Sequence, residues 1–403
     1  MLKLALRNVF RQKLRTGMTL LAIVFGVVGL TLSGGFVQDM YFQLGETIIH
    51  SQSGHLQVLR AGFHAQGTRS PEKFLIDKPE LIKKMLLAQP QVDDVMERVN
   101  FSGLISNGRS DWAIIGEGVE PEGETRLGTH LHMVEGRQLA KNDTYSILLG
   151  EGVAFTLKLR PGDHVTVLLN TAEGALNSLD LEVVGTFRSF SKDFDARAVR
   201  VPLSAAHELL GTKGANSIVV SLKRTEDTRE IAATITRQLD GKQFEVKTWE
   251  QLNDFYKNTV ALYERQFGVL QFIILVLVLL SVGNSVNMSV LERVGEFGTM
   301  MALGNRSGAV FRLVVIENAV LGLCGGALGV VLGLALAWII SAVGIPMPPP
   351  PNANLGYVAH ILVLPSGLLM AFGVGFFATL LAALAPARRV SRIPVVNALM
   401  QNI

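Results

Sequence analysis

The 403-residue sequence predicts a membrane α-helical protein with four transmembrane helices and a large α/β extracytoplasmic domain between helices 1 and 2. The first observation is where the charge lies. Of the 71 Asp, Glu, Lys and Arg residues, five lie in residues 1–37, nine in residues 266–403 and 57 in residues 38–265. The middle therefore has the charge content of a soluble domain, about 25%, whereas both ends are strongly apolar. A single soluble globule is excluded.

The second observation is that three stretches contain no charged residue, namely 16–38, 266–291 and 318–387. A helix needs about 20 apolar residues to cross a bilayer. The third stretch is too long for one helix, and the proline-rich sequence that begins at Pro346 cannot lie inside a helix. We therefore expect transmembrane helices over 17–37, 267–289, 313–343 and 362–386, with a short Pro-rich periplasmic loop over 344–361.

Residues 1–16 precede the first transmembrane helix and carry a periodic set of basic residues. Lys3, Arg7, Arg11 and Arg15 recur every fourth position, so they share one face of a helix. We expect this cytoplasmic amphipathic helix to lie on the anionic inner leaflet; the alternative is that the charges only set the topology. The apolar run after them is longer than that of a cleavable signal peptide, which favours an uncleaved first span.

Basic residues flank the apolar stretches unevenly, and this bias predicts the orientation. They occur in residues 1–15, in the 290–312 connection and in the 387–403 tail, but not in 344–361. We expect a multi-pass protein of the bacterial inner membrane with both termini cytoplasmic and residues 38–266 in the periplasm. That exported region is mildly acidic, which argues against nucleic-acid binding.

The exported region alternates helix and strand signals, which predicts a mixed α/β domain of one or two subdomains. Strand-like alternation appears at 54–60, 95–105, 112–118, 179–187, 198–201 and 217–222, and helical spacing at 79–87, 205–210 and 229–239. Residues 251–265 are expected to form a helix that continues into the second span.

The 290–312 connection contains a short amphipathic helix. Val294, Phe297 and Met301 form an apolar stripe, and Gly304 followed by Asn305 ends the helix. On the cytoplasmic side such a stripe is expected to be buried in lipid or in a partner protein.

The third span carries glycines spaced for close helix packing. Either other helices of the same chain or a dimer partner would pack against this face. The glycines are Gly322, Gly325, Gly326, Gly329 and Gly333.

Enzyme and metal signatures are missing from the sequence. It has no G-x-x-x-x-G-K-[ST] phosphate loop, and His207-Glu208 lacks the second histidine of a zinc-protease motif because position 211 is Gly. We therefore expect no catalytic residues, no metal and no cofactor in this chain. A membrane-anchored sensor or enzyme is the alternative from a different class.

Two segments resemble the ABC transporter permeases typified by the macrolide exporter, the lipoprotein-releasing system and a cell-division protein. Residues 292–304 resemble the family segment E-R-x-x-E-I-G-x-x-x-A-L-G, and residues 386–399 resemble its closing P-A-R-R-A-x-x-x-x-P-x-x-A-L. Phe297 replaces the usual Ile. Gly136-Arg137-Gln138-Leu139 and Pro161-Gly162-Asp163 resemble the periplasmic domain of these permeases.

The resemblance implies a dimeric permease driven by an ABC ATPase dimer that binds ATP and Mg²⁺, the second permease subunit being identical or paralogous. The 290–312 segment would be the coupling helix seated on that ATPase. Its contact residues would be Glu292, Arg293, Glu296, Phe297, Met300, Met301, Leu303 and Gly304.

Residues 34–36, 48–49 and 54–58 are most similar to the lipoprotein-releasing permeases. This similarity implies lipoprotein or lipid cargo taken from the outer leaflet and passed to a periplasmic carrier. The alternatives are drug or peptide efflux with an adaptor protein, and regulation of a cell-wall hydrolase as in cell division.

Overall fold

A computed structural model describes residues 7, 8, 11, 13–67, 71–127, 131–171, 173–189, 191–349 and 356–400. The chain divides into two compact units. The first, called here the helical unit, comprises residues up to Phe42 together with 260–346 and 358–403. The second, the α/β unit, comprises residues 43–259 and 347–357. The predicted fold class is confirmed, because a mixed α/β domain lies between the first and second of four long apolar helices.

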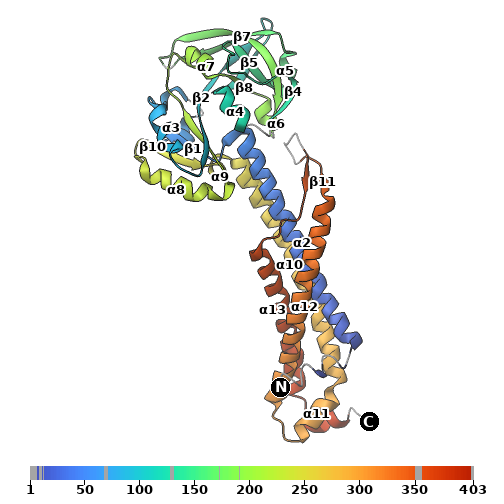
Figure 1. The fold of residues 1–403 in the computed structure, drawn as a ribbon. Helices are drawn as coiled ribbons and strands as arrows, with labels where there is room; N and C mark the ends of the chain where they lie inside the picture. The colour runs from blue at the N-terminus through green and yellow to red at the C-terminus, as the bar shows by residue number, and fades with distance from the viewer. Residues whose placement is uncertain are drawn as a thin grey trace. The chain divides into compact units, whose positions relative to one another are not determined.

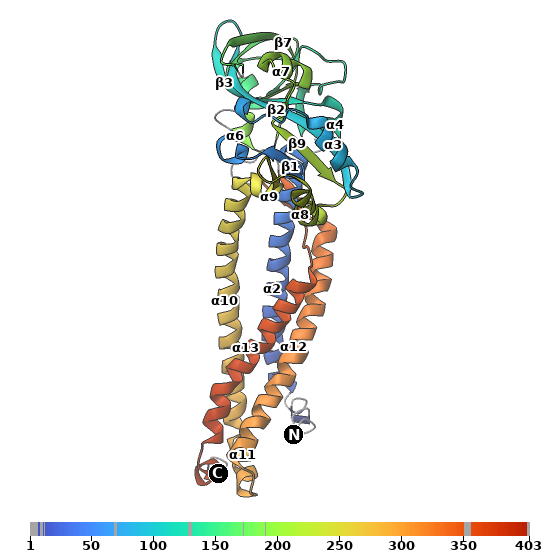
Figure 2. The same cartoon turned by 90° about the vertical axis from the view of Figure 1, so that its left-hand side faces the viewer.

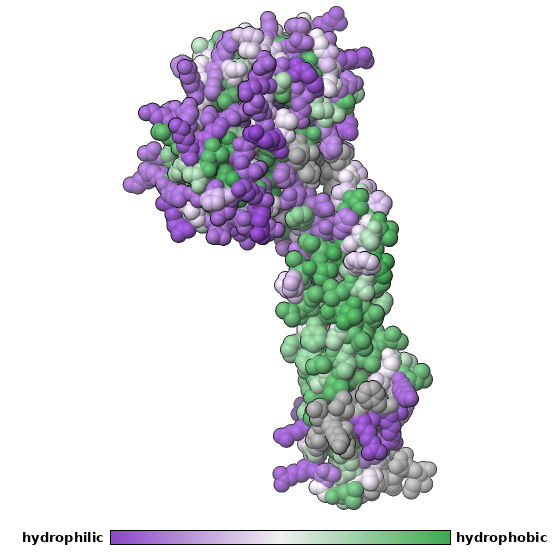
Figure 3. Space-filling view, viewed as in Figure 1, coloured by the Kyte–Doolittle hydropathy of each residue, from purple (hydrophilic) through white to green (hydrophobic). Residues whose placement is uncertain are grey.

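The four long helices are α2 (Lys13–Ile48), α10 (Asp254–Glu292), α12 (Ser307–Val343) and α13 (Pro365–Ser391). Each is long and apolar enough to cross a membrane. Figure 1 and Figure 2 show them running side by side. On the face seen in Figure 3, apolar side chains cover the middle of the helical unit, and hydrophilic side chains lie at its lower end. Because α10 begins at Asp254, the helix before the second span does continue into it, as the sequence predicts. The short helices α11 (Val294–Ala302) and α14 (Val395–Met400) complete this part of the chain.

The core of the helical unit is built from small and β-branched residues. Val282 and Val286 of α10 pack with Ile23 and Val27 of α2, which are fully buried. Small side chains allow the close helix approach that membrane helices need, since lipid supplies no hydrophobic driving force between them. Two short strands, β11 (Ile345–Met347) and β12 (Tyr357–Ala359), pair with each other between α12 and α13.

The α/β unit is built on one ten-stranded sheet with the order β10-β1-β9-β2-β3-β8-β5-β7-β4, in which β6 pairs with β2 and β7. Its strands are β1 (Leu56–Arg60), β2 (Val92–Ser106), β3 (Asp111–Val119), β4 (His132–Gly136), β5 (Ser146–Gly150), β6 (His164–Asn170), β7 (Leu176–Arg188), β8 (Ala198–Pro202), β9 (Ser217–Leu222) and β10 (Phe244–Thr248).

The helices of the α/β unit connect these strands. They are α3 (Pro79–Leu87), α4 (Pro121–Leu127), α5 (Glu151–Leu157), α6 (Lys192–Asp195), α7 (Leu203–Leu210), α8 (Thr228–Gln238) and α9 (Trp249–Leu252), with short turns η1 (Ile49–Ser53), η2 (Phe63–Gly67), η3 (Pro71–Lys73) and η4 (Thr225–Asp227).

The two largest apolar clusters of the α/β unit lie along the single sheet. One packs α3 and α8 on β1, β9 and the start of β2, around Leu86 and Ile235. The other packs α5 and α7 on β5, β7 and the far part of β2, around Val153 and Leu209. The sheet is therefore continuous, and two subdomains are distinguishable only by their cores. The 15-residue strand β2 contributes to both cores.

Candidate functional site

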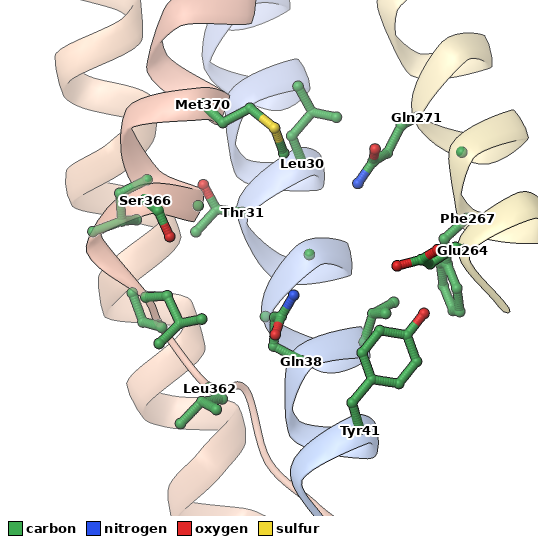
Figure 4. A pocket seen from close by; sticks show the side chains of 18 residues that line it. Leu30, Thr31, Gln38, Tyr41, Glu264, Phe267, Gln271, Leu362, Ser366 and Met370 are labelled. Atoms are coloured by element: carbon green, nitrogen blue, oxygen red, sulfur yellow. The ribbon is translucent and has the colours of Figure 1, made fainter. Parts of the chain in front are cut away.

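The helical unit contains a cavity of about 300 Å³ next to the C-terminal part of α2 and the starts of α10 and α13. Figure 4 shows the side chains that surround it. Leu30, Phe267 and Met370 supply apolar surface, whereas Gln38 and Glu264 supply polar groups. The other lining residues are Thr31, Gly34, Gly35, Val37, Tyr41, Gly268, Gln271, Leu362, Val363, Leu364, Ser366, Gly367 and Leu368. A concave, mostly apolar lining with a few polar groups is typical of ligand sites.

One wall of this cavity is an extended segment before α13 that is tied to α2. The amide of His360 donates to the carboxylate of Asp39 at 2.9 Å, and the amide of Leu362 donates to the carbonyl of Gly35 at 3.1 Å. A Cβ at position 35 would lie 2.6 Å from Ile361, so only glycine allows this approach. Asp39 is buried, and its hydrogen bond to His360 satisfies a polar group that would otherwise be costly there.

The predicted coupling segment forms α11, and Gly304 ends it with a positive φ of 94° as the sequence predicts. The expectation that its apolar stripe is buried in lipid or a partner was wrong for two residues. Val294 and Phe297 are buried against the long helices of this chain, because the turn after α10 folds α11 back onto the bundle. Met300 and Met301 are partly buried against the same core.

Arg293 is also internal rather than exposed. Its guanidinium forms two hydrogen bonds with Glu317 of α12, at 2.7 and 3.1 Å, and a third with Glu296 at 3.1 Å. Glu317 further accepts a hydrogen bond from Asn8 at 2.7 Å. A bidentate arginine–carboxylate pair is geometrically demanding, so this contact holds α11 in a defined orientation on α12.

Among the predicted coupling residues, only Glu292, Leu303 and Gly304 are exposed, and Glu296 is partly exposed. The side chain of Leu303 is 80% exposed. These positions are the most accessible to a partner protein, whereas Arg293 and Phe297 are buried.

The predicted basic face is described only in part. Lys3 and the side chain of Arg15 lie outside the described residues, whereas Arg7 and Arg11 are exposed. Arg11 forms an ion pair with Glu296 of α11 at 2.7 Å. The N-terminal segment therefore contacts the coupling segment, which the sequence did not reveal.

The glycines of α12 pack against helices of the same chain, which decides the question left open by the sequence. A Cβ at Gly325 or Gly329 would lie within 3 Å of Ile23 or Val27 of α2, respectively. Gly333 faces α2 in the same way, while Gly322 and Gly326 face Phe376 and Phe372 of α13. Three helices therefore approach one another closely along this face, and a Cβ would lie within 3 Å of a neighbouring side chain at Gly325, Gly326 and Gly329.

A buried ionic cluster in the α/β unit holds the end of α2 and was not expected from the sequence. Arg200 of β8 pairs with Glu117 at 3.0 Å and with Glu124 at 3.4 Å, and Arg98 of β2 pairs with Glu124 at 2.5 Å. Arg200 also donates to the carbonyl of Ser51 at 3.1 Å.

This cluster caps the last turn after α2, because Arg98 donates in the same way to the carbonyl of Gln52. Carbonyls at a helix C-terminus have no partner within the helix and carry partial negative charge. Burial would raise the pKa of Glu124, but the guanidinium groups of Arg98 and Arg200 outweigh it and lower that pKa. The four charges therefore balance inside the unit.

A second contact stabilises the same turn, η1. The indole of Trp249 at the start of α9 packs on Ile48 and Ile49, and its ring centre lies 4.6 Å from that of Tyr256 in α10. A Cβ at Gly45 would lie 2.7 Å from the indole. The segments that continue α2 and begin α10 are thus packed together within the α/β unit.

Comparisons with known proteins match this architecture along most of the chain. The family description "MacB-like periplasmic core domain" matches residues 16–238, and "FtsX-like permease C-terminal" matches residues 268–395.

Three relatives are similar to this chain. An uncharacterized ABC transporter permease from Methanocaldococcus jannaschii is 28% identical over 52% of this chain and 52% of its own length. The lipoprotein-releasing system transmembrane protein LolE of Haemophilus influenzae is 21% identical over 93% of this chain and 90% of its own. The macrolide export ATP-binding/permease protein MacB of a Shewanella species is 24% identical over 100% of this chain and 60% of its own. The chain thus spans about half of the first relative, and these identities do not separate the lipoprotein-releasing proteins from the macrolide exporters.

Proposed function

The chain belongs to the MacB/FtsX-like family of ABC transporter permeases, and from this we propose that it transmits the conformational change of its partner ATPase to its periplasmic domain and extracts lipid or lipoprotein from the outer leaflet of the inner membrane. Family membership makes it a multi-pass membrane protein with a periplasmic domain and implies the ATPase partner. Termini in the cytoplasm, a bacterial inner-membrane location, and ATP and Mg²⁺ bound by the ATPase are parts of the proposal.

The observation that carries the cargo assignment is the cavity beside Gly34 and Gly35. Its lining includes the part of α2 that is nearest in sequence to the periplasmic domain, so we assign the cavity to the depth of the outer leaflet. Its lining combines apolar side chains such as Leu30 and Met370 with a few polar groups, among them Gln38 and Glu264. Such a lining suits an amphiphile whose tail would enter the bundle and whose head would stay at the interface.

The transmission assignment is supported by the construction of α2 and α10. They are unbroken helices of 36 and 39 residues, so each spans roughly 55 Å at 1.5 Å per residue. In the turn η1, which directly follows α2, Arg98 and Arg200 of the buried cluster bind the carbonyls of Gln52 and Ser51. A displacement of the helix is therefore passed to the sheet rather than absorbed by a loose loop.

The ATPase would be contacted through the exposed part of the coupling segment, around Leu303. A second permease subunit, identical or paralogous, would complete the complex, and a periplasmic carrier or adaptor protein would receive the cargo.

The test is reconstitution of the permease with its ATPase in vesicles, with release of a fluorescent lipoprotein measured during ATP hydrolysis. Leu303→Asp is expected to abolish permease-stimulated hydrolysis because it places a charge in the ATPase contact. Phe155→Asp, equally exposed at 85% on the periplasmic α5, is the matched control and is expected to leave stimulation intact. Release of a macrolide or peptide, with no release of lipoprotein, would replace the cargo assignment by efflux. Unchanged stimulation in Leu303→Asp would refute the coupling role.

A further inference from the structure

The charge of the cavity in the helical unit is set by a single residue. Among the 18 residues that line it, Glu264 is the only one with a carboxylate, and none is Lys, Arg or His. Glu264 is exposed, and no basic side chain of the described residues lies within ion-pairing distance of it. The neighbouring Arg265 points about 100° around the helix from Glu264 and is not part of the lining.

Glu264 lies on the cavity face of α10, one turn from Phe267 and two turns from Gln271. Figure 4 shows the side chains of Glu264 and Gln271 directed from α10 toward α2. The facing Tyr41 donates its hydroxyl hydrogen to the carbonyl of Val260 at 3.3 Å, so its phenol is already engaged by the protein. The carboxylate of Glu264 is therefore the charged group of the lining that remains available to a ligand.

An unpaired carboxylate beside aromatic rings favours a cationic ligand group. It attracts an ammonium ion by charge and by hydrogen bonds, and the attraction is stronger at a membrane interface than in bulk water because the effective dielectric constant is lower. The ring of Phe267 adds a face that also attracts cations. A phosphate or carboxylate head group would instead meet a like charge.

We propose that this cavity selects amphiphiles that carry an ammonium group next to their apolar tail, with Glu264 as the specificity-determining residue. This inference rests on the proposed function, since it specifies the cargo of the same site. The ammonium group has two chemical sources, the free N-terminal amine of a diacylated lipopeptide and the amine of a small cationic amphiphile.

The test measures binding to the permease–ATPase complex in nanodiscs of phosphatidylglycerol, a lipid without an amine. The probes are a fluorescent diacyl lipopeptide with a free N-terminal amine and the same lipopeptide N-acetylated, which differ only at that amine. At pH 7 the free amine is mostly protonated, because an α-amino group has a pKa of about 7.7–8.0. We expect the wild type to prefer the free-amine form by about tenfold.

In Glu264→Gln the preference is expected to fall to near one, with the affinity for the acetylated form unchanged, since only the charge is lost. Glu230→Gln, which removes an exposed carboxylate from α8, is the matched control and should keep the preference. Raising the pH to 9.5 should reduce the preference in the wild type as the lipopeptide amine loses its proton.

A second pair of probes, dodecylamine and dodecanol as competitors, distinguishes the two sources. If dodecylamine competes, dodecanol does not, and the competition is lost in Glu264→Gln, the inference is supported for small amphiphiles. If in addition no lipopeptide binds, the lipoprotein cargo is refuted while the inference stands. Equal wild-type affinity for the charged and neutral members of both pairs would overturn the inference while leaving a lipid cargo intact. Binding of none of the four probes would overturn both.

Discussion

Replacing Arg200 in the buried cluster of the α/β unit is expected to destabilise that unit strongly. Arg200 is 2% exposed and bonds to Glu117, Glu124 and the carbonyl of Ser51. Arg200→Met keeps a side chain of similar length but leaves the cluster with one uncompensated negative charge and an orphaned carbonyl. Removing one partner of a buried ion pair costs about 3–5 kcal/mol, and we expect a loss in this range.

The measurement is urea unfolding of the detergent-solubilised chain, followed by tryptophan fluorescence in a Trp338→Phe background, so that the signal comes from Trp112 and Trp249 of the α/β unit. The matched control is Arg126→Met, which breaks a 2.5 Å pair with Asp94 whose arginine is 66% exposed. Exposed pairs contribute about 0–1 kcal/mol, so this variant should unfold close to wild type.

Two further outcomes decide whether the reasoning is correct. Adding Glu117→Leu to Arg200→Met should recover part of the stability, because the second change removes the unpaired buried charge. In vesicles the single variant should retain ATPase stimulation while cargo release falls, since the end of α2 is no longer held. A loss below about 1 kcal/mol for Arg200→Met would refute the argument that the cluster clamps this helix.

The remaining predictions concern close packing and pH. Gly329→Ala places a Cβ 2.7 Å from Val27 and should lower the free energy of unfolding, measured in SDS, by about 1–3 kcal/mol. The control Gly373→Ala meets open space and should raise the free energy of unfolding by up to about 1 kcal/mol through helix propensity. Equal effects of the two variants would contradict the packing argument. His55 accepts the amide of Leu222 on Nδ1 at 3.1 Å, and burial, followed by the nearby His50, lowers the pKa of His55 to about 4. Because the unfolded state binds the proton more readily, stability should fall as the pH drops from about 6.5 to 4. Hydrogen exchange at Leu222, corrected for its intrinsic pH dependence, should accelerate over that range; constant protection would show that His55 is not titrating.

The main features of the fold could be predicted from local sequence. Charge-free stretches identified the four long helices, and alternation located strands such as 112–118, observed as Asp111–Val119. Short elements such as α4, β4 and β5 were missed, because five to seven residues carry too little periodicity to distinguish helix from strand. The apolar stripe of α11 was recognised, but its burial partner was assigned wrongly, since a pattern shows that a face must be buried and not where.

The functional surfaces, too, could be predicted only in part from the sequence. The glycine positions of α12 follow from spacing, yet only the structure shows that Gly329 packs on Val27 of α2 rather than on another subunit. Glu264 has no sequence signal at all, because its importance comes from neighbours more than 200 residues away in the chain, such as Gln38.

The sequence by itself determined which parts of this protein lie in a membrane and which form a water-soluble domain, because that partition depends on composition summed over about 20 neighbouring residues. The tertiary structure alone decided that Arg98 and Arg200 meet the end of α2, and that a cavity with one carboxylate opens beside Gly35. Those features depend on contacts between segments distant in the chain, whose partners are selected by the packing of the whole fold and leave no local pattern.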